Sequence, residues 1–361
     1  MSYERPNIAQ MQGYTWGEQP ADARTLKLNT NENPYPPSPA VGQALRTFDA
    51  DLLRRYPQPT ADPFRDLVAA HFGLERQQIL VTNGGDELLR LAFTTFLSPG
   101  QPFATAAPSY SLYPVLAAVA DAPVLNIPLD DHWQLPDDFV AQLNSAGAGL
   151  CALVNPHAPS GVLMPLAQLE AVADEFDGVL LIDEAYVDFV DPDAAQESTA
   201  LLQAHDNVLL LRTLSKGYAL AGLRLGWGMG AASLIEPMLT KTRDSYNINA
   251  VTQALAAAAF ADQAHARDSW TRVRNERARL ADALAELGFT MPTSQSNFLL
   301  AYAPASVPAA ETLYLGLKAR GILVRWFNQP RLRDALRISI GTPEENDRLL
   351  SVLRELTSHQ D

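Results

Sequence analysis

The sequence predicts an α/β fold, with a large domain built on a mainly parallel central sheet covered by helices and a smaller α+β domain after it. Two observations predict this class. From about residue 63, short apolar runs alternate with helical patterns, as is typical of parallel sheets buried on both faces. Near residue 248 the pattern changes to a long alanine-rich helical stretch. The 361 residues are enough for roughly two domains.

The chain opens with a segment that we expect to be an N-terminal arm, over residues 1–40. Its six prolines exclude a helix or a central strand for most of its length. Tyr14, Trp16 and Tyr35 favour an arm packed on the body or on a partner subunit over a loose tail, because disordered tails are usually poor in aromatic residues.

The large domain is expected over residues 41–247. A helical pattern that includes Leu88 and Phe96 follows its first strand and ends before Pro99. Ligands of such sheets bind beyond the carboxyl ends of the strands, so the residues just after each strand are candidate site residues. The predicted strands are the apolar runs at 79–81, 103–106, 124–127, 150–154, 179–182, 208–211 and 225–229.

The smaller C-terminal domain is expected over residues 248–361. One long helical stretch runs from 248 to about Leu287, links the two domains and stops at Gly288. Thr342 and Glu345 predict a capping box at the start of the final helix. Between these helices we expect strands at 298–301, 322–326 and 336–340 and a helix near 309–320.

Charge and the lack of targeting signals restrict the classes of function. The 27 basic and 41 acidic residues give a net charge of −14, which speaks against non-specific binding to nucleic acid or to an anionic membrane. Residues 1–10 show no secretory signal, and no apolar run approaches the roughly 20 residues that cross a bilayer. The single cysteine, Cys151, fits a reducing compartment. We expect a soluble, cytoplasmic protein.

Lys216 is a candidate nucleophile because it follows the strand at 208–211, between small residues. A lysine just past a buried strand loses solvation, which lowers its pKa and makes the amine nucleophilic. The alternative is an ordinary surface lysine.

Asp183 ends the strand at 179–182, and Tyr186 lies three residues further on. A carboxylate in this place can pair with a cation or cap the next segment, and a capped turn is the alternative to a functional role. The six histidines show no metal-ligand spacing, so we expect no metal site.

Residues 84–87 (Gly-Gly-Asp-Glu) open a helix directly after a strand. Free N–H groups at such a helix start bind phosphate, and Ser215 and Arg224 can add contacts to the same anion. The alternative is a plain strand-to-helix turn with Asp86 as the N-cap. Residues 226–231 match a loose dinucleotide-binding pattern, but no following strand with a ribose-binding acid is apparent. A dinucleotide-dependent oxidoreductase is therefore a distant alternative.

Seven motifs in a fixed order resemble the fold-type I enzymes that use pyridoxal 5′-phosphate. Four further segments, at 13–20, 28–34, 324–327 and 336–342, are similar to the histidinol-phosphate aminotransferase family. The seven motifs are G-G-D-E at 84–87, P-S-Y at 108–110, N-P-H-A-P-S-G at 155–161, D-E-A-Y at 183–186, T-L-S-K at 213–216, G-L-R at 222–224 and L-R-I-S at 336–339.

The resemblance implies roles for the cofactor residues. Lys216 forms a Schiff base with the cofactor and moves a proton during the reaction. Asp183 pairs with the protonated ring nitrogen, so that the ring acts as an electron sink, and Tyr186 donates to the ring oxygen O3′. Tyr110 stacks on the ring. The phosphate contacts implied are Gly85, Asp86, Ser215 and Arg224, with Tyr56 reaching in from the other subunit of a homodimer.

The resemblance also implies the reaction. It is a ping-pong transamination of L-histidinol phosphate and 2-oxoglutarate to imidazole acetol phosphate and L-glutamate, in histidine biosynthesis. Arg337 holds the substrate phosphate in one half-reaction and the glutamate carboxylate in the other, and Arg325 and Tyr14 add phosphate contacts. An aromatic or broad-range aminotransferase and a threonine-phosphate-type decarboxylase remain open. A cofactor-binding regulator without turnover would bring a DNA-binding module, which this acidic chain does not fit.

One position departs from the family pattern. Enzymes of this fold commonly carry an asparagine that donates to the ring O3′, and Ala158 stands in its place. Either Tyr186 acts alone, or Asn155 or His157 reaches the ring. We predict Asn155 as a cofactor contact.

Overall fold

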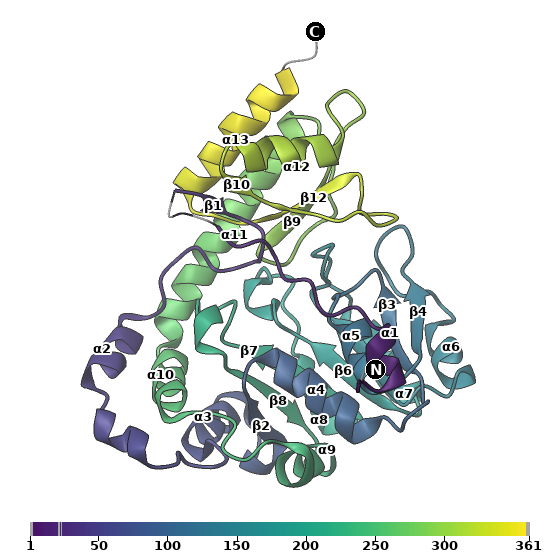
Figure 1. The fold of residues 1–361 in the computed structure, drawn as a ribbon, viewed down its shortest axis with the longest axis vertical. Coiled ribbons are helices and arrows are strands. Elements are labelled where there is room, and N and C mark those ends of the chain that lie inside the picture. The colour runs from purple at the N-terminus through teal and green to yellow at the C-terminus, as the bar shows by residue number, and fades with distance from the viewer. Residues whose placement is uncertain (1–2, 21, 23, 359–361) are drawn as a thin grey trace.

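The computed structural model describes residues 3–20, 22 and 24–358; the outermost parts of the predicted arm and C-terminal domain, and two positions inside the arm, lie outside the described residues. A seven-stranded sheet forms its centre (Figure 1). All seven predicted runs form strands. Their order across the sheet is β2 (Ile79–Thr82), β8 (Gly226–Gly230), β7 (Val208–Thr213), β6 (Val179–Asp183), β5 (Leu150–Val154), β3 (Phe103–Ala107) and β4 (Val124–Pro128).

The sheet is mainly parallel, as predicted. Only β8 runs against its two neighbours, β2 and β7. In β5 the successive residues Leu150, Cys151 and Ala152 alternate between two buried apolar clusters, one on each face. One face is covered by α4 (Gly85–Phe96), α5 (Tyr113–Val119) and α9 (Ala232–Pro237). The other is covered by α3 (Asp62–Phe72), α6 (Phe139–Ser145), α7 (Leu166–Glu175), α8 (Leu201–Ala204) and α10 (Ala250–Ala261), and α2 (Pro39–Thr47) packs on the outside of α10.

The C-terminal part carries a three-stranded antiparallel sheet in the order β11 (Arg325–Trp326), β12 (Ala335–Ser339), β9 (Phe298–Tyr302). The helices α12 (Ala310–Ala319) and α13 (Pro343–Ser358) pack on it around a third apolar cluster. The run predicted at 322–326 as one strand is split. Its first half, β10 (Ile322–Leu323), leaves this sheet and pairs with the arm instead.

The arm packs on the body and touches both parts of it. Its helix α1 (Pro6–Gln10) lies on α5, where Asn7 Nδ2 donates to Ala118 O at 2.9 Å. Further on, β1 (Leu26–Lys27) runs parallel to β10, and Leu28 is buried in the C-terminal cluster. The arm therefore crosses from the large sheet to the small one (Figure 1, purple trace).

The single helical stretch predicted at 248–287 is wrong in one respect, because it consists of two helices. Helix α10 ends before Asp262, whose carboxylate accepts the His265 N–H at 3.3 Å and caps α11 (Gln263–Glu286). The buried face of α10 belongs to the large sheet's core, whereas Val273 and Leu280 of α11 belong to the C-terminal cluster. The division at residue 247 stays a prediction.

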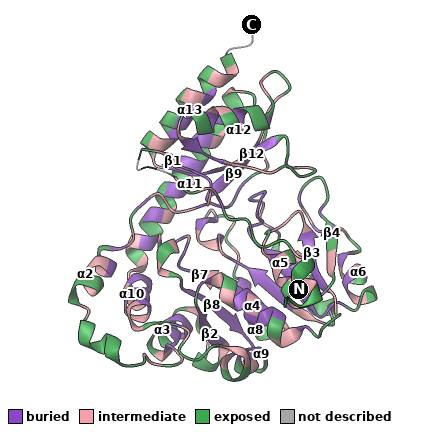
Figure 2. Cartoon of the chain, viewed as in Figure 1, coloured by how far each residue is buried: buried purple, intermediate pink, exposed green. Residues whose placement is uncertain are grey.

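The capping box predicted for the last helix is confirmed. The Glu345 N–H donates to Thr342 Oγ1 at 3.3 Å, and the Thr342 N–H donates to Glu345 Oε2 at 2.8 Å. Figure 2 shows the inner strands of the large sheet buried, the edge strand β4 more exposed, and the outer faces of the helices exposed. Within the described part of the chain, no helix has the length and apolar character needed to cross a bilayer.

Candidate functional site

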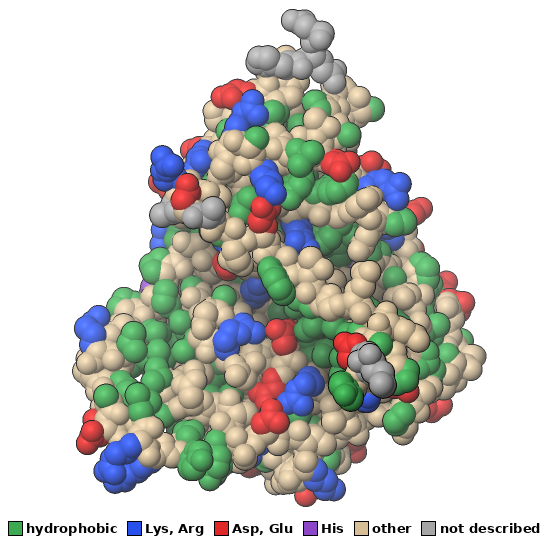
Figure 3. All heavy atoms as spheres, in the orientation of Figure 1, with side chains coloured by type: hydrophobic (Ala, Val, Ile, Leu, Met, Phe, Trp, Pro, Cys, Tyr) green, Lys and Arg blue, Asp and Glu red, His purple; other side chains and the backbone are tan. Residues whose placement is uncertain are grey.

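A cavity of about 230 Å³ lies where the carboxyl ends of β5, β6 and β7 meet the C-terminal sheet and the arm. Figure 3 shows a hollow between the large-sheet part of the molecule and the C-terminal part, with basic and acidic side chains inside it. The predicted site residues on its wall are Tyr14, Gly85, Asp86, Tyr110, Asp183, Tyr186, Ser215, Lys216, Arg224, Arg325 and Arg337.

Lys216 lies in the loop that follows β7. Its Nζ donates to the backbone oxygen of Thr30, in the arm, at 2.9 Å. Burial, with the nearby Arg337 cation as the next cause, lowers the pKa of Lys216 to about 8. The amine is thus fixed at the cavity wall with a larger neutral, nucleophilic fraction than an exposed lysine has.

Asp183, the last residue of β6, is a buried carboxylate. Its Oδ2 accepts from the Tyr113 hydroxyl at 3.3 Å, and its Oδ1 accepts from the Ala185 N–H at 3.1 Å. Burial raises the pKa of Asp183 to about 6. No cation within the described ranges comes close enough to form an ion pair with it, so the carboxylate is available to a protonated group in the cavity.

The start of α4 faces the cavity with no side chain capping it; its N-cap is Gly84. Gly84 has φ of +76°, which favours glycine, and a Cβ there would lie 2.5 Å from Nη2 of Arg224, so a larger residue would also displace this guanidinium. Arg224 Nη2 donates to Asp86 Oδ2 at 3.3 Å, and its Nη1 donates to Ser215 Oγ at 3.4 Å. Free N–H groups, a hydroxyl and a guanidinium converge here, which is a phosphate-binding arrangement.

Two tyrosines stand at the side of the cavity. Tyr110 donates to Asp86 Oδ1 at 3.4 Å, and burial raises its pKa far above the usual value. The ring of Tyr14 meets the ring of Tyr110 edge to face, with centroids 6.1 Å apart. The arm therefore contributes an aromatic wall opposite the large sheet.

Arg325 and Arg337 form the opposite end of the cavity. They are cross-strand neighbours in the β11–β12 pair, and both guanidiniums lie near the ring of Phe327, at 5.2 and 5.3 Å from its centroid. Arg337 Nη2 donates to Asn29 O at 3.2 Å, whereas its Nε has no partner in the described part of the chain. Burial lowers the pKa of Arg337. The two adjacent guanidiniums have no carboxylate counter-ion in the described ranges, and such a pair makes a binding site for anions.

Asn155, predicted as a cofactor contact, is not among the residues that line the cavity. Its Oδ1 accepts from the Met164 N–H at 2.8 Å, and its Nδ2 donates to Met164 O at 3.3 Å. His157 is also turned away, with its Nε2 3.0 Å from Pro108 O. Ala158, in contrast, does line the cavity. The structure therefore does not bring Asn155 to the site, because its amide holds a loop of the large sheet.

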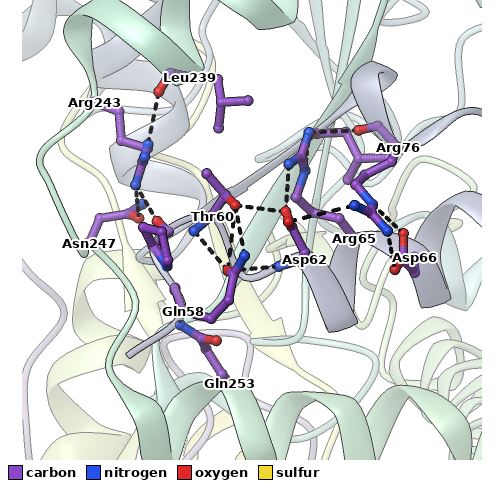
Figure 4. Close-up of polar contacts among 12 residues, drawn as sticks. Gln58, Thr60, Asp62, Arg65, Asp66, Arg76, Leu239, Arg243, Asn247 and Gln253 are labelled. Atoms are coloured by element: carbon purple, nitrogen blue, oxygen red, sulfur yellow. Dashed lines mark hydrogen bonds and ion pairs between the residues drawn. The ribbon is translucent and has the colours of Figure 1, made fainter. Parts of the chain in front are cut away.

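Tyr56 also lies away from the cavity. It is 81 % exposed and stacks on Tyr246, with ring centroids 4.6 Å apart. Polar contacts fix the loop that follows it (Figure 4): Gln253 Nε2 donates to Gln58 O at 2.8 Å, and Arg243 Nη1 donates to Pro59 O at 2.6 Å. The tyrosine is thus exposed at the start of a loop that hydrogen bonds hold to α10 and to Arg243.

Three residues that hydrogen-bond to predicted site residues were missed from the sequence, and two of them, Thr30 and Asn31, line the cavity. Tyr113 contacts Asp183, and both Thr30 and Asn31 contact predicted site residues from the arm. Tyr113 lies in a helix, and the other two lie in an irregular segment. The pattern makes candidates only of residues just after predicted strands, so these three are not included. The segment 28–34 that carries the family resemblance does contain Thr30 and Asn31. Among the described residues, no group of three or more His, Cys, Asp or Glu side chains is placed to hold a metal ion.

Comparison with known proteins gives a consistent result. Residues 23–353 match the aminotransferase class I and II family model. The chain is 42 % identical over 361 residues to histidinol-phosphate aminotransferase 1 of a Nostoc species, covering 100 % of this chain and 99 % of that protein. It is 40 % identical over 355 residues to histidinol-phosphate aminotransferase of a Marinomonas species, covering 97 % of this chain and 98 % of that protein.

The fold is shared with solved structures. Histidinol-phosphate aminotransferase from Sinorhizobium meliloti, in complex with pyridoxal-5′-phosphate, matches with a TM-score of 0.90 at 24 % identity, covering 99 % of this chain and 98 % of that one. L-threonine-O-3-phosphate decarboxylase from Porphyromonas gingivalis matches with a TM-score of 0.79 at 19 % identity, covering 92 % and 99 %. At these identities the likeness establishes the fold.

Proposed function

The chain belongs to the aminotransferase class I and II family, and on that premise we propose that it is a histidinol-phosphate aminotransferase that uses pyridoxal 5′-phosphate. It converts L-histidinol phosphate and 2-oxoglutarate to imidazole acetol phosphate and L-glutamate, in histidine biosynthesis. One observation carries this proposal: a single cavity has a lysine, a carboxylate and a phosphate-binding helix start at one end, and at the other two arginines with no counter-ion among the described residues.

The residues at the sheet end fit the cofactor. Its phosphate would be held at the uncapped start of α4 by Arg224 and Ser215, next to Asp86. Its protonated ring nitrogen would meet the Asp183 carboxylate. The buried hydroxyl of Ser109, on the cavity wall, has no partner in the described part of the chain and adds a free polar atom to this end.

Each residue at the sheet end has a separate role toward the cofactor. When bound, pyridoxal phosphate supplies an electron sink for the charge that develops on the substrate carbon. Lys216 would hold the cofactor through its amine and would later hold and move a proton, which its lowered pKa suits. Tyr186 would donate to the ring oxygen, and Tyr110 would pack against the ring. Asp183 would keep the ring nitrogen protonated.

Substrate choice falls to the C-terminal end. Arg337 holds the phosphate of L-histidinol phosphate in one half-reaction and the α-carboxylate of glutamate in the other. Arg325 and Tyr14 add contacts to the phosphate. Both arginines lack a carboxylate partner among the described residues, which supports a role in binding anions that enter and leave.

The working form in this proposal is a homodimer, in which Tyr56 reaches the cofactor phosphate of the partner subunit. Its exposure and its place outside the cavity support that role. Leu52 and Leu53, next to it, are 49 % and 58 % exposed, and such an apolar patch suits an interface. The cytoplasmic location stays a prediction.

The test is an absorbance spectrum of the purified protein, loaded with pyridoxal phosphate, before and after addition of L-histidinol phosphate without a keto acid. We expect the band of the lysine-bound cofactor to be lost at low substrate concentration and only weakly with L-phenylalanine. A band that responds better to phenylalanine would move the protein to the aromatic aminotransferases. A protein that gives no band with the cofactor would refute the proposal.

A further inference from the structure

A chain of buried polar groups leads from the C-terminal sheet to the cavity wall. It consists of Ser339 at the end of β12, Asn31 in the arm and Tyr186 beyond β6. Ser339 is 3 % exposed and Asn31 is 1 % exposed. Buried polar atoms are expected to have hydrogen-bond partners, because leaving them unpaired costs free energy. We therefore account for the hydrogen bonds that join these three residues.

One set of directions satisfies all three hydrogen bonds. The backbone N–H of Asn31 donates to Ser339 Oγ at 2.9 Å, so the serine's own proton is left for Asn31 Oδ1, 3.1 Å away. With Oδ1 facing the serine, the amide Nδ2 faces Tyr186 and donates to its hydroxyl oxygen at 3.0 Å. Within the described residues the Tyr186 hydroxyl has no other hydrogen-bond partner. Its proton therefore has no acceptor other than a group in the cavity.

We propose that Asn31, oriented by Ser339, is a positioning residue that directs the Tyr186 proton into the cavity, toward the ring oxygen of the cofactor. This inference rests on the proposed function. If the amide were reversed, Asn31 Oδ1 would accept the tyrosine's proton and remove it from the cavity. The arrangement matters in this chain because Ala158, on the cavity wall, has no side-chain donor.

The surroundings support this role. The backbone of Asn31 is left-handed, with φ of 57°, which asparagine tolerates better than most residues, and Asn297 Nδ2 fixes its carbonyl at 2.9 Å. Burial raises the pKa of Tyr186, so the hydroxyl keeps its proton at neutral pH. The charged groups that face it are Arg337, which favours the ionised form, and Asp183, which opposes it. Lys216 Nζ lies 5.8 Å from its ring centroid.

The test uses the protein loaded with pyridoxal phosphate and measures the pH midpoint of the cofactor's absorbance change. Loss of a donor to the negatively charged ring oxygen disfavours the deprotonated cofactor, so the midpoint rises. We expect Tyr186→Phe to raise it by about 1 pH unit, since one unit corresponds to a single strong hydrogen bond. Asn31→Asp, whose carboxylate only accepts, should raise it by a similar amount. Ser339→Ala, which adds no charge and lies off the cavity wall, should raise it by less.

Double variants separate this role from other causes. In the Tyr186→Phe background, Ser339→Ala should produce no further shift, and Asn31→Asp should produce only the smaller shift due to its added charge. Ser296→Ala is the matched control, because the buried Ser296 hydroxyl has no partner within the described residues. Its midpoint should equal that of the parent.

Either of two results would overturn this inference and leave the proposed function standing. One is that Asn31→Asp and Ser339→Ala bind the cofactor and keep the parent midpoint while Tyr186→Phe shifts it. The other is that the Ser339→Ala shift persists undiminished in the Tyr186→Phe background. If the parent protein itself shows no cofactor band, the proposed function fails, and the inference fails with it.

Discussion

The two ends of the cavity differ in how their charged groups are partnered. At the sheet end, Arg224 donates to Asp86 and Asp183 accepts from Tyr113. At the C-terminal end, the guanidiniums of Arg325 and Arg337 lie side by side with no carboxylate of the described chain to pair with. A buried cation without a counter-ion is costly, and an incoming anion relieves that cost. The difference fits a resident cofactor at one end and anions that exchange in every cycle at the other.

The largest expected effect comes from Lys216→Ala, because it removes both the nucleophile and the proton carrier from the sheet end. Turnover should fall by a factor on the order of 10⁴. Steady-state kinetics with L-histidinol phosphate and the cofactor absorbance band provide the measurement. Lys241→Ala is the matched control, since Lys241 lies away from the cavity. Residual activity close to that of the control would remove Lys216 from its role.

Substitution of Arg325 and Arg337 tests whether the C-terminal end of the cavity binds the substrates. Arg337→Met should raise the KM of both L-histidinol phosphate and 2-oxoglutarate by about 10- to 100-fold, because a hydrogen bond to a charged group contributes about 1.5–3 kcal/mol. Arg325→Met should raise the KM of L-histidinol phosphate more than that of 2-oxoglutarate. Cofactor affinity should hardly change in either variant. A large loss of cofactor affinity would mean that the two ends are not separate.

Arg224→Met should give the reverse pattern. Cofactor affinity should fall by about 10- to 100-fold, since one charge-assisted contact to phosphate is lost. The KM for L-histidinol phosphate, measured at saturating cofactor, should stay near the parent value. Titration of the cofactor-free protein with pyridoxal phosphate gives the affinity, and an unchanged dissociation constant would move the phosphate away from the start of α4.

The pH dependence of cofactor attachment tests whether Arg337, at the C-terminal end, influences the pKa of Lys216 at the sheet end. Only the neutral Lys216 amine reacts, and the neutral fraction grows as the pH rises through the pKa of about 8. The rate at which cofactor-free protein takes up pyridoxal phosphate should therefore rise up to about pH 8 and level off above it. Because the Arg337 cation helps to lower this pKa, Arg337→Met should move the midpoint upward. A rate that does not vary between about pH 6 and 9 contradicts the assignment.

The smallest expected effect on the site comes from Asn155→Ala. The side chain bonds both backbone groups of Met164, so the variant should lose about 1–2 kcal/mol of folding free energy. The cofactor spectrum and KM values should be those of the parent. Thermal unfolding together with the spectrum is the measurement. A shifted absorbance band would show that Asn155 reaches the cofactor after all.

The sheet end could be predicted from the sequence because its geometry follows from strand order. Lys216, Asp183 and the start of α4 come directly after predicted strands, and parallel strands bring their carboxyl ends to one edge. The strands in the middle of the sheet were found for a related reason, since strands buried on both faces are continuous apolar runs.

The C-terminal end could not be derived in that way. Arg325 and Arg337 were named from the family resemblance alone, because neither follows a strand of the main sheet. Asn31 was missed, since its contacts to Ser339 span 308 positions and its segment has no periodicity to interpret. Asn155 was predicted from its motif, but a motif does not show which way an amide turns. The break at Asp262 was also missed, because no glycine or proline separates the alanine-rich α10 from the more charged α11.

The measurement that tests the separation of the two ends most directly is a crystal structure of the Lys216→Ala protein with pyridoxal phosphate and L-histidinol phosphate bound together. The account predicts the cofactor phosphate at the start of α4, with Arg224 turned from Asp86 to the phosphate. It predicts the substrate phosphate between Arg325 and Arg337. A substrate phosphate bound elsewhere, with these two arginines free, would contradict it.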